Sequence, residues 1–310
     1  MNTTTAINGL FEAAKTYPDF DAQERLNRLV GLDEHKGRLT KMLSLLVNPQ
    51  GLKQWAARHH SEAGHLVNMI FRRPPLVVLA GDVGSGKSEL AETIGDAVAR
   101  QEDIDITLLP LSLSSRGQGR VGEMTQLISS AFEYTVNEAQ KLKSTSGASR
   151  GGVILLVDEA DALAQSREAA QMHHEDKAGV NAFIRGIDRI ANGQLPAAVI
   201  MCTNRLNALD PAIQRRAADI LTFHRPDTNQ RFSVLNTLLS QLGFSKSQIN
   251  SVVEATGPHG DRKYGFTFSD LTQRLIPAIV LDAYPSKAIT PECAIKIAQR
   301  IEPTPPFQEK

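Results

Sequence analysis

Cysteine is one of the residue types of which this chain has little. Only Cys202 and Cys293 occur among the 310 residues, and neither has a second cysteine or a histidine at the spacing of a zinc site. The sequence therefore supports neither a disulfide framework nor a zinc centre, and we expect both thiols to be free and buried.

The chain also carries no formal net charge. The 34 Lys and Arg residues balance the 34 Asp and Glu residues, so no overall field attracts nucleic acid or an anionic membrane surface. Aromatic residues make up only 5% of the chain, which leaves few side chains for stacking on bases. Neither a nucleic acid nor a membrane is therefore expected as a partner.

Long hydrophobic runs are absent too. No apolar stretch approaches the ~20 residues that span a bilayer, and residues 1–9 lack the basic stretch and apolar centre of a secretory signal. We therefore expect a cytoplasmic protein.

What remains is the composition of an average globular protein, with 41% apolar and 22% charged residues. At roughly 150 residues per domain, the length predicts two domains, or one large domain with an appendage. Short, continuous apolar runs rich in Val, Ile and Leu predict buried parallel strands. The runs are 76–80, 104–113, 153–157 and 197–202, with a fifth strand expected at 219–223.

Helical patterns lie between these runs. Apolar residues recur at three- and four-residue spacing over 88–100, 122–143 and 177–191, so strands and helices alternate. We predict loops at 58–75, which is basic and contains histidines, and at 144–152. The pattern predicts an α/β fold in which a parallel five-stranded sheet lies between helices.

The strand signals stop near Pro226. Helical patterns follow at 228–241, 246–254, 267–283 and 291–300. We therefore expect a small all-helical domain after the α/β domain, and a boundary at Pro226. The predicted parts are a short extension 1–25, a large α/β domain 26–226, the helical domain 227–302 and a disordered tail 303–310.

A phosphate-binding pattern lies between the first predicted strand and the first predicted helix, which is the context that this motif requires. Its glycines let backbone N–H groups and a helix N-terminus face a phosphate chain. Lys87 would reach the β- and γ-phosphates, and the Ser88 hydroxyl would bind Mg²⁺. The pattern G-x-x-x-x-G-K-[ST] is matched by Gly81, Asp82, Val83, Gly84, Ser85, Gly86, Lys87 and Ser88.

Two carboxylates, Asp158 and Glu159, follow the apolar run 153–157. The carboxyl edge of a parallel sheet is where ligands bind, so Asp158 is placed to hold Mg²⁺ or one of its waters. Glu159 is placed to polarise the water that attacks the γ-phosphate. Solvated carboxylates often cap helices, so the pair alone would be weak evidence for a nucleotide site. Together with the phosphate loop roughly 70 residues upstream, it is strong evidence for one.

Polar residues also follow the fourth run. Asn204 could orient the attacking water or contact the γ-phosphate, with a turn-forming asparagine as the alternative. Arg215 and Arg216 lie on a predicted short helix that begins at the Asp-Pro pair 210–211. A guanidinium from a neighbouring subunit would stabilise charge on the transferring phosphoryl group, and a solvated basic turn is the alternative.

Together these motifs resemble those of the AAA+ ATPase family over about residues 30–300. In that family the phosphate loop is Walker A, the segment 153–159 is Walker B and Asn204 corresponds to sensor 1. The resemblance implies that ATP and Mg²⁺ are bound and that the helical domain is a lid. It also implies a homo-oligomer, usually a hexameric ring with active sites between subunits.

For some further residues, only this resemblance implies a role. Arg215 or Arg216 would be the arginine finger. In the lid, Ser269 stands near the expected place of the sensor 2 arginine, and Arg274 is the candidate for that role. The residues that would pack against adenine are Val30, Gly31 and Leu32.

A narrower resemblance is to the pachytene-checkpoint ATPases, also called thyroid-receptor-interacting ATPases. The turn 216–220 lacks the arginine-glycine-arginine pattern of most AAA+ members, and 274–277 in the lid is similar to this group. The group includes bacterial members associated with cyclic-nucleotide antiviral signalling. Its rings remodel HORMA-domain proteins, so a HORMA-type partner is implied.

The resemblance also locates a pore loop that would grip the protein substrate. Arg120 and Val121 stand where other members have an aromatic residue followed by a hydrophobic one. An arginine offers less apolar contact than a Tyr or Trp ring. We therefore expect Arg120 and Val121 to line a central pore with a weaker grip on extended polypeptide.

Two other functions stay open. The AAA+ fold also serves nucleic-acid motors and loaders, which the basic residues Arg58, His59, His60, Arg72 and Arg73 would favour. The neutral overall charge and few aromatic residues speak against such a motor. The other alternative is a slow nucleotide-gated switch that acts through assembly alone.

Overall fold

The structure is a computed structural model that describes residues 10–113, 122–144, 149–163, 174–260 and 262–307. The chain divides into two compact units. The first comprises Met1–Asn27, Glu34–Ala80 and Ser88–Thr222, and the second comprises Arg28–Asp33, Gly81–Lys87 and Phe223–Lys310.

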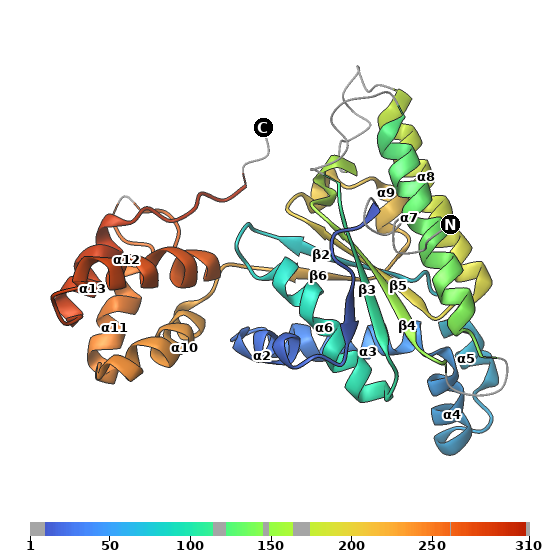
Figure 1. Cartoon of the computed structure of the whole chain (residues 1–310), viewed down its shortest axis with the longest axis horizontal. Coiled ribbons are helices and arrows are strands. Elements are labelled where there is room, and N and C mark those ends of the chain that lie inside the picture. The colour runs from blue at the N-terminus through green and yellow to red at the C-terminus, as the bar shows by residue number, and fades with distance from the viewer. Residues whose placement is uncertain (1–9, 114–121, 145–148, 164–173, 261, 308–310) are drawn as a thin grey trace. The chain divides into compact units, whose positions relative to one another are not determined.

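A six-stranded sheet forms the centre of the first unit (Figure 1). Its strands lie in the order β1-β3-β4-β5-β2-β6, and β3, β4, β5 and β2 are parallel neighbours. At the edge, β1 pairs antiparallel with β3. The strands are β1 Lys15–Tyr17, β2 Leu76–Gly81, β3 Ile106–Ser112, β4 Gly152–Asp158, β5 Ala197–Thr203 and β6 Ala217–Phe223.

Helices cover both faces of this sheet, which explains why every residue of β5 is buried. On one face, Phe132 of α7 meets Phe183 of α8 edge to face, with 5.3 Å between ring centroids. On the other face, Val47 of α3 lies so close to Gly152 that a Cβ there would come within 2.8 Å. The helices are α2 Phe20–Arg28, α3 Asp33–Val47, α4 Pro49–His59, α5 Gly64–Phe71, α6 Lys87–Glu102, α7 Glu123–Leu142, α8 His174–Gly193 and α9 Pro211–Gln214.

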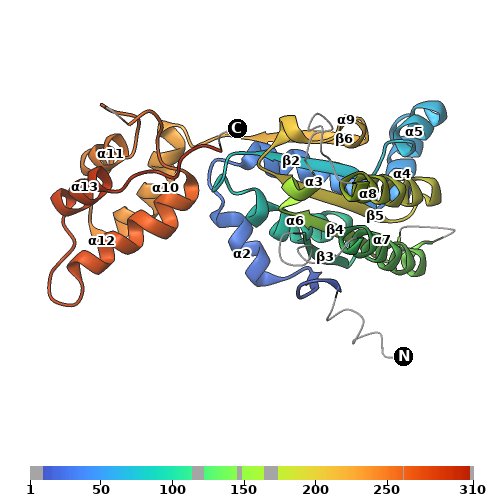
Figure 2. The ribbon, with the colours of Figure 1, turned by 90° about the horizontal axis from the view of Figure 1, so that it is seen from above.

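The second unit is built on helices that gather around one apolar core, drawn in orange and red in Figure 2. Capping boxes fix the starts of two of them, with Asp227 and Gln230 at the first and Ser245 and Gln248 at the second. The elements are α10 Thr228–Leu239, α11 Lys246–Ala255, a π-helical segment Asp270–Leu275, α12 Ile276–Ala283 and α13 Pro291–Arg300.

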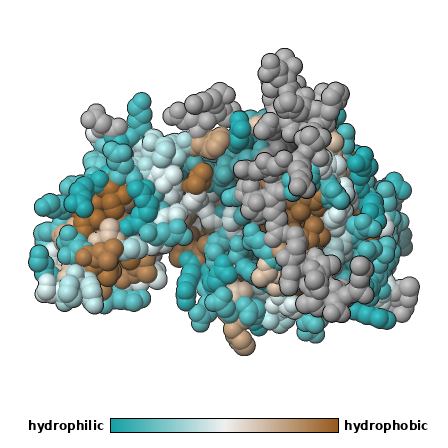
Figure 3. Space-filling view, turned by 45° about the horizontal axis from the view of Figure 1, so that its top comes forward, coloured by the Kyte–Doolittle hydropathy of each residue, from teal (hydrophilic) through white to brown (hydrophobic). Residues whose placement is uncertain are grey.

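Apolar side chains also reach the surface of the second unit, as the brown area on its face in Figure 3 shows. Among the exposed apolar residues of this unit are Val280 and Leu281 of α12 and the following Tyr284. No helix in the described part of the chain is both long enough and apolar enough to span a membrane.

The structure confirms the α/β fold and all five strands expected from the apolar runs. A sixth strand, β1, is additional and antiparallel, so the sheet is not wholly parallel. The expected loop at 58–75 was wrong, because α5 occupies Gly64–Phe71. Val67, Ile70 and Phe71 give this helix an apolar side that packs with Leu52 and Ala56 of α4.

Neither Cys202 nor Cys293 forms a disulfide bond in the part of the chain that the structure describes. Cys202 is buried in β5, as expected, but Cys293 is only partly buried. The Cys293 thiol donates to Asp282 Oδ2 at 3.0 Å, and this carboxylate is the main cause of its raised pKa. The expectation of two buried thiols was therefore wrong for Cys293.

Candidate nucleotide site

The phosphate loop follows β2 and belongs to the second unit. Gly81, Gly84 and Gly86 all have positive φ angles, of 148°, 70° and 93°. A Cβ at Gly81 would lie 2.0 Å from the carbonyl oxygen of Phe223, and one at Gly84 would lie 2.8 Å from Thr267 Oγ1. Only glycine fits these positions, so the conformation of the loop explains the glycines of the motif.

Lys87 lies inside the curve of this loop with only 6% of its surface exposed. Its ammonium donates to the carbonyl oxygens of Gly81 at 2.9 Å and Asp82 at 2.7 Å, and it lies 3.4 Å from Ser85 Oγ. The loop therefore holds a cation at its centre, which suits a phosphate chain. Val83 is exposed at the tip of the loop, whereas Ser85 is buried.

The residues expected to contact adenine lie in the same unit. Gly31, at φ +77°, accepts a hydrogen bond on its carbonyl oxygen from Gln230 Nε2 at 2.8 Å. Leu32 is 5% exposed and borders the phosphate loop, because a Cβ at Gly86 would come within 3.2 Å of its Cδ1. Val30 packs against the helical core. The segment Arg28–Asp33 thus joins the phosphate loop to the helices.

The helical part of the second unit reaches the phosphate loop through Ser269. Its backbone N–H donates to the carbonyl oxygen of Gly84 at 3.2 Å. Arg274 instead donates from Nη1 to Asp270 Oδ1 at 2.8 Å and to Thr304 Oγ1 at 3.4 Å. These contacts leave the sensor 2 role of Arg274 a prediction.

Asp270 is the buried centre of that cluster. Burial on its own would raise its pKa, but hydrogen bonds from Thr267 and Thr304 and the contact with Arg274 favour the carboxylate, and the pKa is lowered. Thr304 binds Asp270 through both its backbone N–H and its hydroxyl. The tail, which we expected to be disordered from 303, is therefore bound at Thr304.

In the first unit, Asp158 ends β4 opposite Ser112 of β3. Its Oδ1 accepts a hydrogen bond from the backbone N–H of Glu159 at 2.8 Å. Glu159 is exposed and has a φ of +51°, a region that residues other than glycine rarely occupy. Strained backbone of this kind gathers at functional sites, so the geometry supports a chemical role for Glu159.

Asn204 lies just beyond β5 and is held by Asp161. The carboxylate of Asp161 accepts from the backbone N–H of Asn204 at 3.0 Å and from its side-chain Nδ2 at 3.1 Å. It also accepts from Thr203 Oγ1 at 2.5 Å. Thr203, the residue before Asn204, pairs with Ala80 of β2 in the parallel sheet. We did not assign Asp161 from sequence, although it is the third acid of 158–161.

The two candidate arginine fingers differ in their surroundings. Arg216 forms an ion pair with Asp188 of α8, with Nε–Oδ1 and Nη2–Oδ2 distances of 3.0 and 3.2 Å. Arg215 is exposed, and its guanidinium makes no ion pair with any described residue. Of the two side chains, Arg216 is therefore the one that a described ion pair holds in place. The pore-loop candidates Arg120 and Val121 lie outside the described residues.

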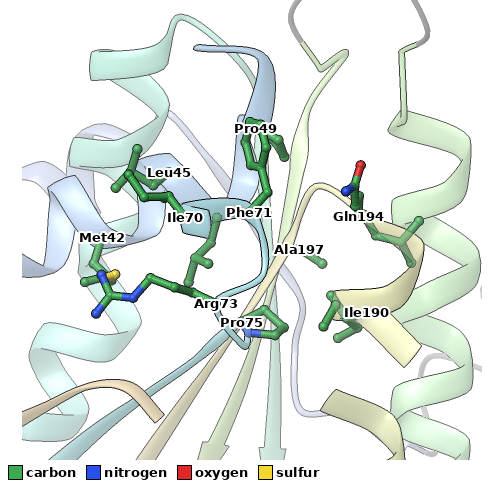
Figure 4. Close-up of a pocket in the computed structure, with 13 residues that line it drawn as sticks. Met42, Leu45, Pro49, Ile70, Phe71, Arg73, Pro75, Ile190, Gln194 and Ala197 are labelled. Atoms are coloured by element: carbon green, nitrogen blue, oxygen red, sulfur yellow. The ribbon is translucent and has the colours of Figure 1, made fainter. Parts of the chain in front are cut away.

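A separate apolar cavity lies at the opposite, amino-terminal edge of the sheet (Figure 4). Pro75, which precedes β2, and Ala197, which begins β5, both line it together with Ile70 and Phe71 of α5. Its volume is about 40 Å³, far below the several hundred Å³ of a typical ligand pocket. This cavity is too small for a nucleotide.

Comparison with known proteins agrees with these features. Residues 77–225 match the ATPase family associated with various cellular activities (AAA). The chain belongs to this AAA ATPase family, which confirms the resemblance inferred from its motifs. Within the family it is similar over its whole length to the CD-NTase-associated protein 6 of Escherichia coli strain MS 115-1. The two are 64% identical over 310 residues, which is 100% of each chain.

Other relatives agree with this placement. The CD-NTase-associated protein 6 of Escherichia coli strain KTE188 is 34% identical over 299 residues, covering 96% of this chain and 97% of the relative. A chain in the structure of the E. coli MS115-1 HORMA:CdnC:Trip13 complex is 64% identical with a TM-score of 0.90, covering 97% of this chain and 99% of that one. The structure of Rhizobiales Trip13 is 61% identical with a TM-score of 0.74, covering 96% and 100%.

Proposed function

We propose that this chain hydrolyses ATP with Mg²⁺ and uses the energy to remodel a HORMA-domain protein. The observation that carries the proposal is the 64% identity, with a TM-score of 0.90, to a chain solved in a HORMA:CdnC:Trip13 complex. The complete phosphate-loop motif and the paired carboxylates supply the chemistry that such a role needs.

The residues present fit ATP and Mg²⁺. The glycine positions of the loop exclude any Cβ, and Lys87 holds a positive charge within the loop. Ser88 and Asp158 offer a hydroxyl and a carboxylate, which are oxygen ligands that Mg²⁺ prefers. This donor set matches the one that P-loop enzymes use for a nucleoside triphosphate.

In this proposal each residue of the site has one task. The loop N–H groups and Lys87 hold the β- and γ-phosphates in place. Ser88 and Asp158 would hold Mg²⁺, which would supply positive charge to neutralise the phosphate oxygens. Glu159 orients a water and accepts its proton, and Asn204 fixes the position of that water or of the γ-phosphate. Val30, Gly31 and Leu32 pack against the base.

Assembly completes the site in this proposal. Arg215 of one subunit would reach the γ-phosphate of the next subunit in a homo-hexameric ring, where a guanidinium stabilises transition-state charge. The exposed apolar side chains Val280 and Leu281 support assembly, because contacts between subunits would remove them from water.

Arg120 and Val121 would line the central pore and contact the HORMA-domain protein. Replacing both with alanine should stop remodelling and leave nucleotide binding, assembly and basal ATP hydrolysis in place, because a pore loop acts after nucleotide binding. Full remodelling by this double variant would remove the pore assignment, and loss of ATP binding would place the loop in the nucleotide site.

The experiment that tests the proposed partner uses Glu159→Gln as a trap. This variant should bind ATP without hydrolysing it, so it should hold its protein substrate. We expect it to co-elute in size-exclusion chromatography with the HORMA protein of E. coli MS115-1 together with its CdnC when ATP is present, and to elute alone when ATP is absent. Retention of single-stranded DNA in place of these proteins would favour the nucleic-acid motor.

A further inference from the structure

The phosphate loop carries an acidic residue at its second position. Asp82 has a carboxylate that is 17% exposed, and its Oδ1 accepts a hydrogen bond from the N–H of Val83 at 2.9 Å. Like charges repel strongly when they are shielded from water. A carboxylate at this position therefore opposes the binding of a triphosphate unless a cation compensates it.

Arg225 supplies that cation. Its Nε donates to Asp82 Oδ2 at 2.6 Å, and the Arg225 side chain is only 15% exposed. The motif that identifies the phosphate loop contains no residue from this region, because Arg225 lies between β6 and α10. The pair joins residues that are 143 positions apart in the sequence.

Other contacts fix the guanidinium of Arg225 in this position. Its Nη1 donates to the carbonyl oxygen of Gly265 at 2.9 Å, and its Nη2 donates to that of Thr304 at 2.7 Å. Its guanidinium carbon lies 4.8 Å from the centroid of the Tyr264 ring, within cation–π range. Each of the three guanidinium nitrogens thus has an acceptor, and the side chain is preorganised to face Asp82.

We propose that Arg225 is a positioning residue for nucleotide binding, which neutralises the Asp82 carboxylate so that the loop can accept a polyphosphate. This inference rests on the proposed binding of ATP to the phosphate loop. Its direct consequence is that Arg225 is needed only because Asp82 is charged. Removing the charge of Asp82 therefore compensates for the loss of Arg225.

A double-mutant cycle tests this dependence by titration of a fluorescent ATP analogue. Arg225→Met should raise the Kd about tenfold or more, because Asp82 is left uncompensated beside the phosphates. Adding Asp82→Asn to Arg225→Met should recover most of the lost affinity, because the charge that Arg225 compensates is then absent. Arg225→Lys keeps the positive charge and should also bind more tightly than Arg225→Met.

A matched control separates charge compensation from damage to the helical unit. Arg262 is another arginine of this unit, and it donates to the carbonyl oxygens of Ala255, Ala298 and Ile301. It lies over the ring of Phe266, with 5.2 Å to the centroid. No described hydrogen bond or ion pair links it to the phosphate loop, so Arg262→Met should retain the wild-type Kd while its thermal unfolding midpoint falls.

The outcomes separate this inference from the proposed function. Wild-type affinity in Arg225→Met, or a double variant as weak as Arg225→Met, would overturn the role of Arg225. In either case, loss of nucleotide binding in Lys87→Ala would still support the assignment of the nucleotide site. If Arg225→Met does not fold, Arg225→Lys decides, because loss of binding in a folded variant that keeps the charge would contradict charge compensation. A wild-type chain that binds no nucleotide would contradict both proposals.

Discussion

Asp161 holds Asn204 by both its backbone and its side chain. One carboxylate oxygen accepts from the backbone N–H at 3.0 Å, and the other accepts from the side-chain Nδ2 at 3.1 Å. A side-chain amide that is fixed in this way loses little freedom when it orients a reacting group. Asp161 is thus a positioning residue for the proposed role of Asn204.

The first prediction is that Asp161→Ala lowers the rate of ATP hydrolysis more than it lowers nucleotide affinity. A misplaced Asn204 should reduce kcat about 100-fold, while the phosphate loop stays intact. Steady-state ATPase assays and titration of a fluorescent ATP analogue measure the two effects. Asp105→Ala, which removes an exposed carboxylate just before β3, is the control. An unchanged kcat in Asp161→Ala would refute the positioning role.

The second prediction separates binding from hydrolysis. Lys87→Ala should lose nucleotide binding, because it removes the ammonium that lies within the phosphate loop. Glu159→Gln should keep near wild-type affinity but lose turnover, because the amide cannot accept a proton from water. Calorimetric titration with ATP and Mg²⁺ measures the affinity of both variants. Tight binding of ATP by Lys87→Ala would contradict the assignment of this loop as the phosphate-binding loop.

The third prediction concerns the arginine finger. Arg215→Ala should lose about 10³-fold in turnover, because this exposed guanidinium would act on the nucleotide of a neighbouring subunit. Mixing it with Lys87→Ala should restore part of the activity, since mixed rings contain intact shared sites. Mixtures that are shown to co-assemble and yet remain inactive would argue against the role. Arg216→Ala provides the comparison, because Arg216 is already paired with Asp188.

The fourth prediction is an acid-dependent stability that arises from Asp270. Its pKa is lower in the folded chain than its ordinary value, so its ionised form stabilises the fold above about pH 4, and this contribution is lost as the pH falls further. Asp270→Asn should therefore have a lower urea midpoint at pH 7 than the wild type. The difference should shrink below about pH 4. A difference in urea midpoint that stays constant with pH would contradict the stabilising role of the Asp270 carboxylate.

The sequence predicted the strands well because parallel strands that are covered on both faces form continuous apolar runs. It missed β1, because the three residues Lys15–Tyr17 are too few to show alternation. It missed α5 because the basic and histidine residues around 58–65 suggested a loop. The apolar positions Val67, Ile70 and Phe71 were the signal that could have identified this helix.

The candidate site could be inferred from sequence where a local motif exists, whereas contacts between distant residues could not be inferred. The glycines of the phosphate loop have positive φ angles that the motif anticipates. Arg225 has no motif, and only the presence of an acid at Asp82 indicates that a cation is needed nearby. Asp161 serves Asn204, which lies 43 residues away in the sequence. Pairings of this kind depend on the fold rather than on local pattern.

We propose that ATP hydrolysis by this chain changes the state of a HORMA-domain protein. The most direct measurement follows the HORMA protein of E. coli MS115-1, bound to its CdnC, by size-exclusion chromatography and limited proteolysis after incubation with this chain. We expect the complex to dissociate with wild-type chain and ATP, and to stay intact without ATP or with Glu159→Gln. A complex that persists while the wild-type chain hydrolyses ATP in the same sample would contradict the claim.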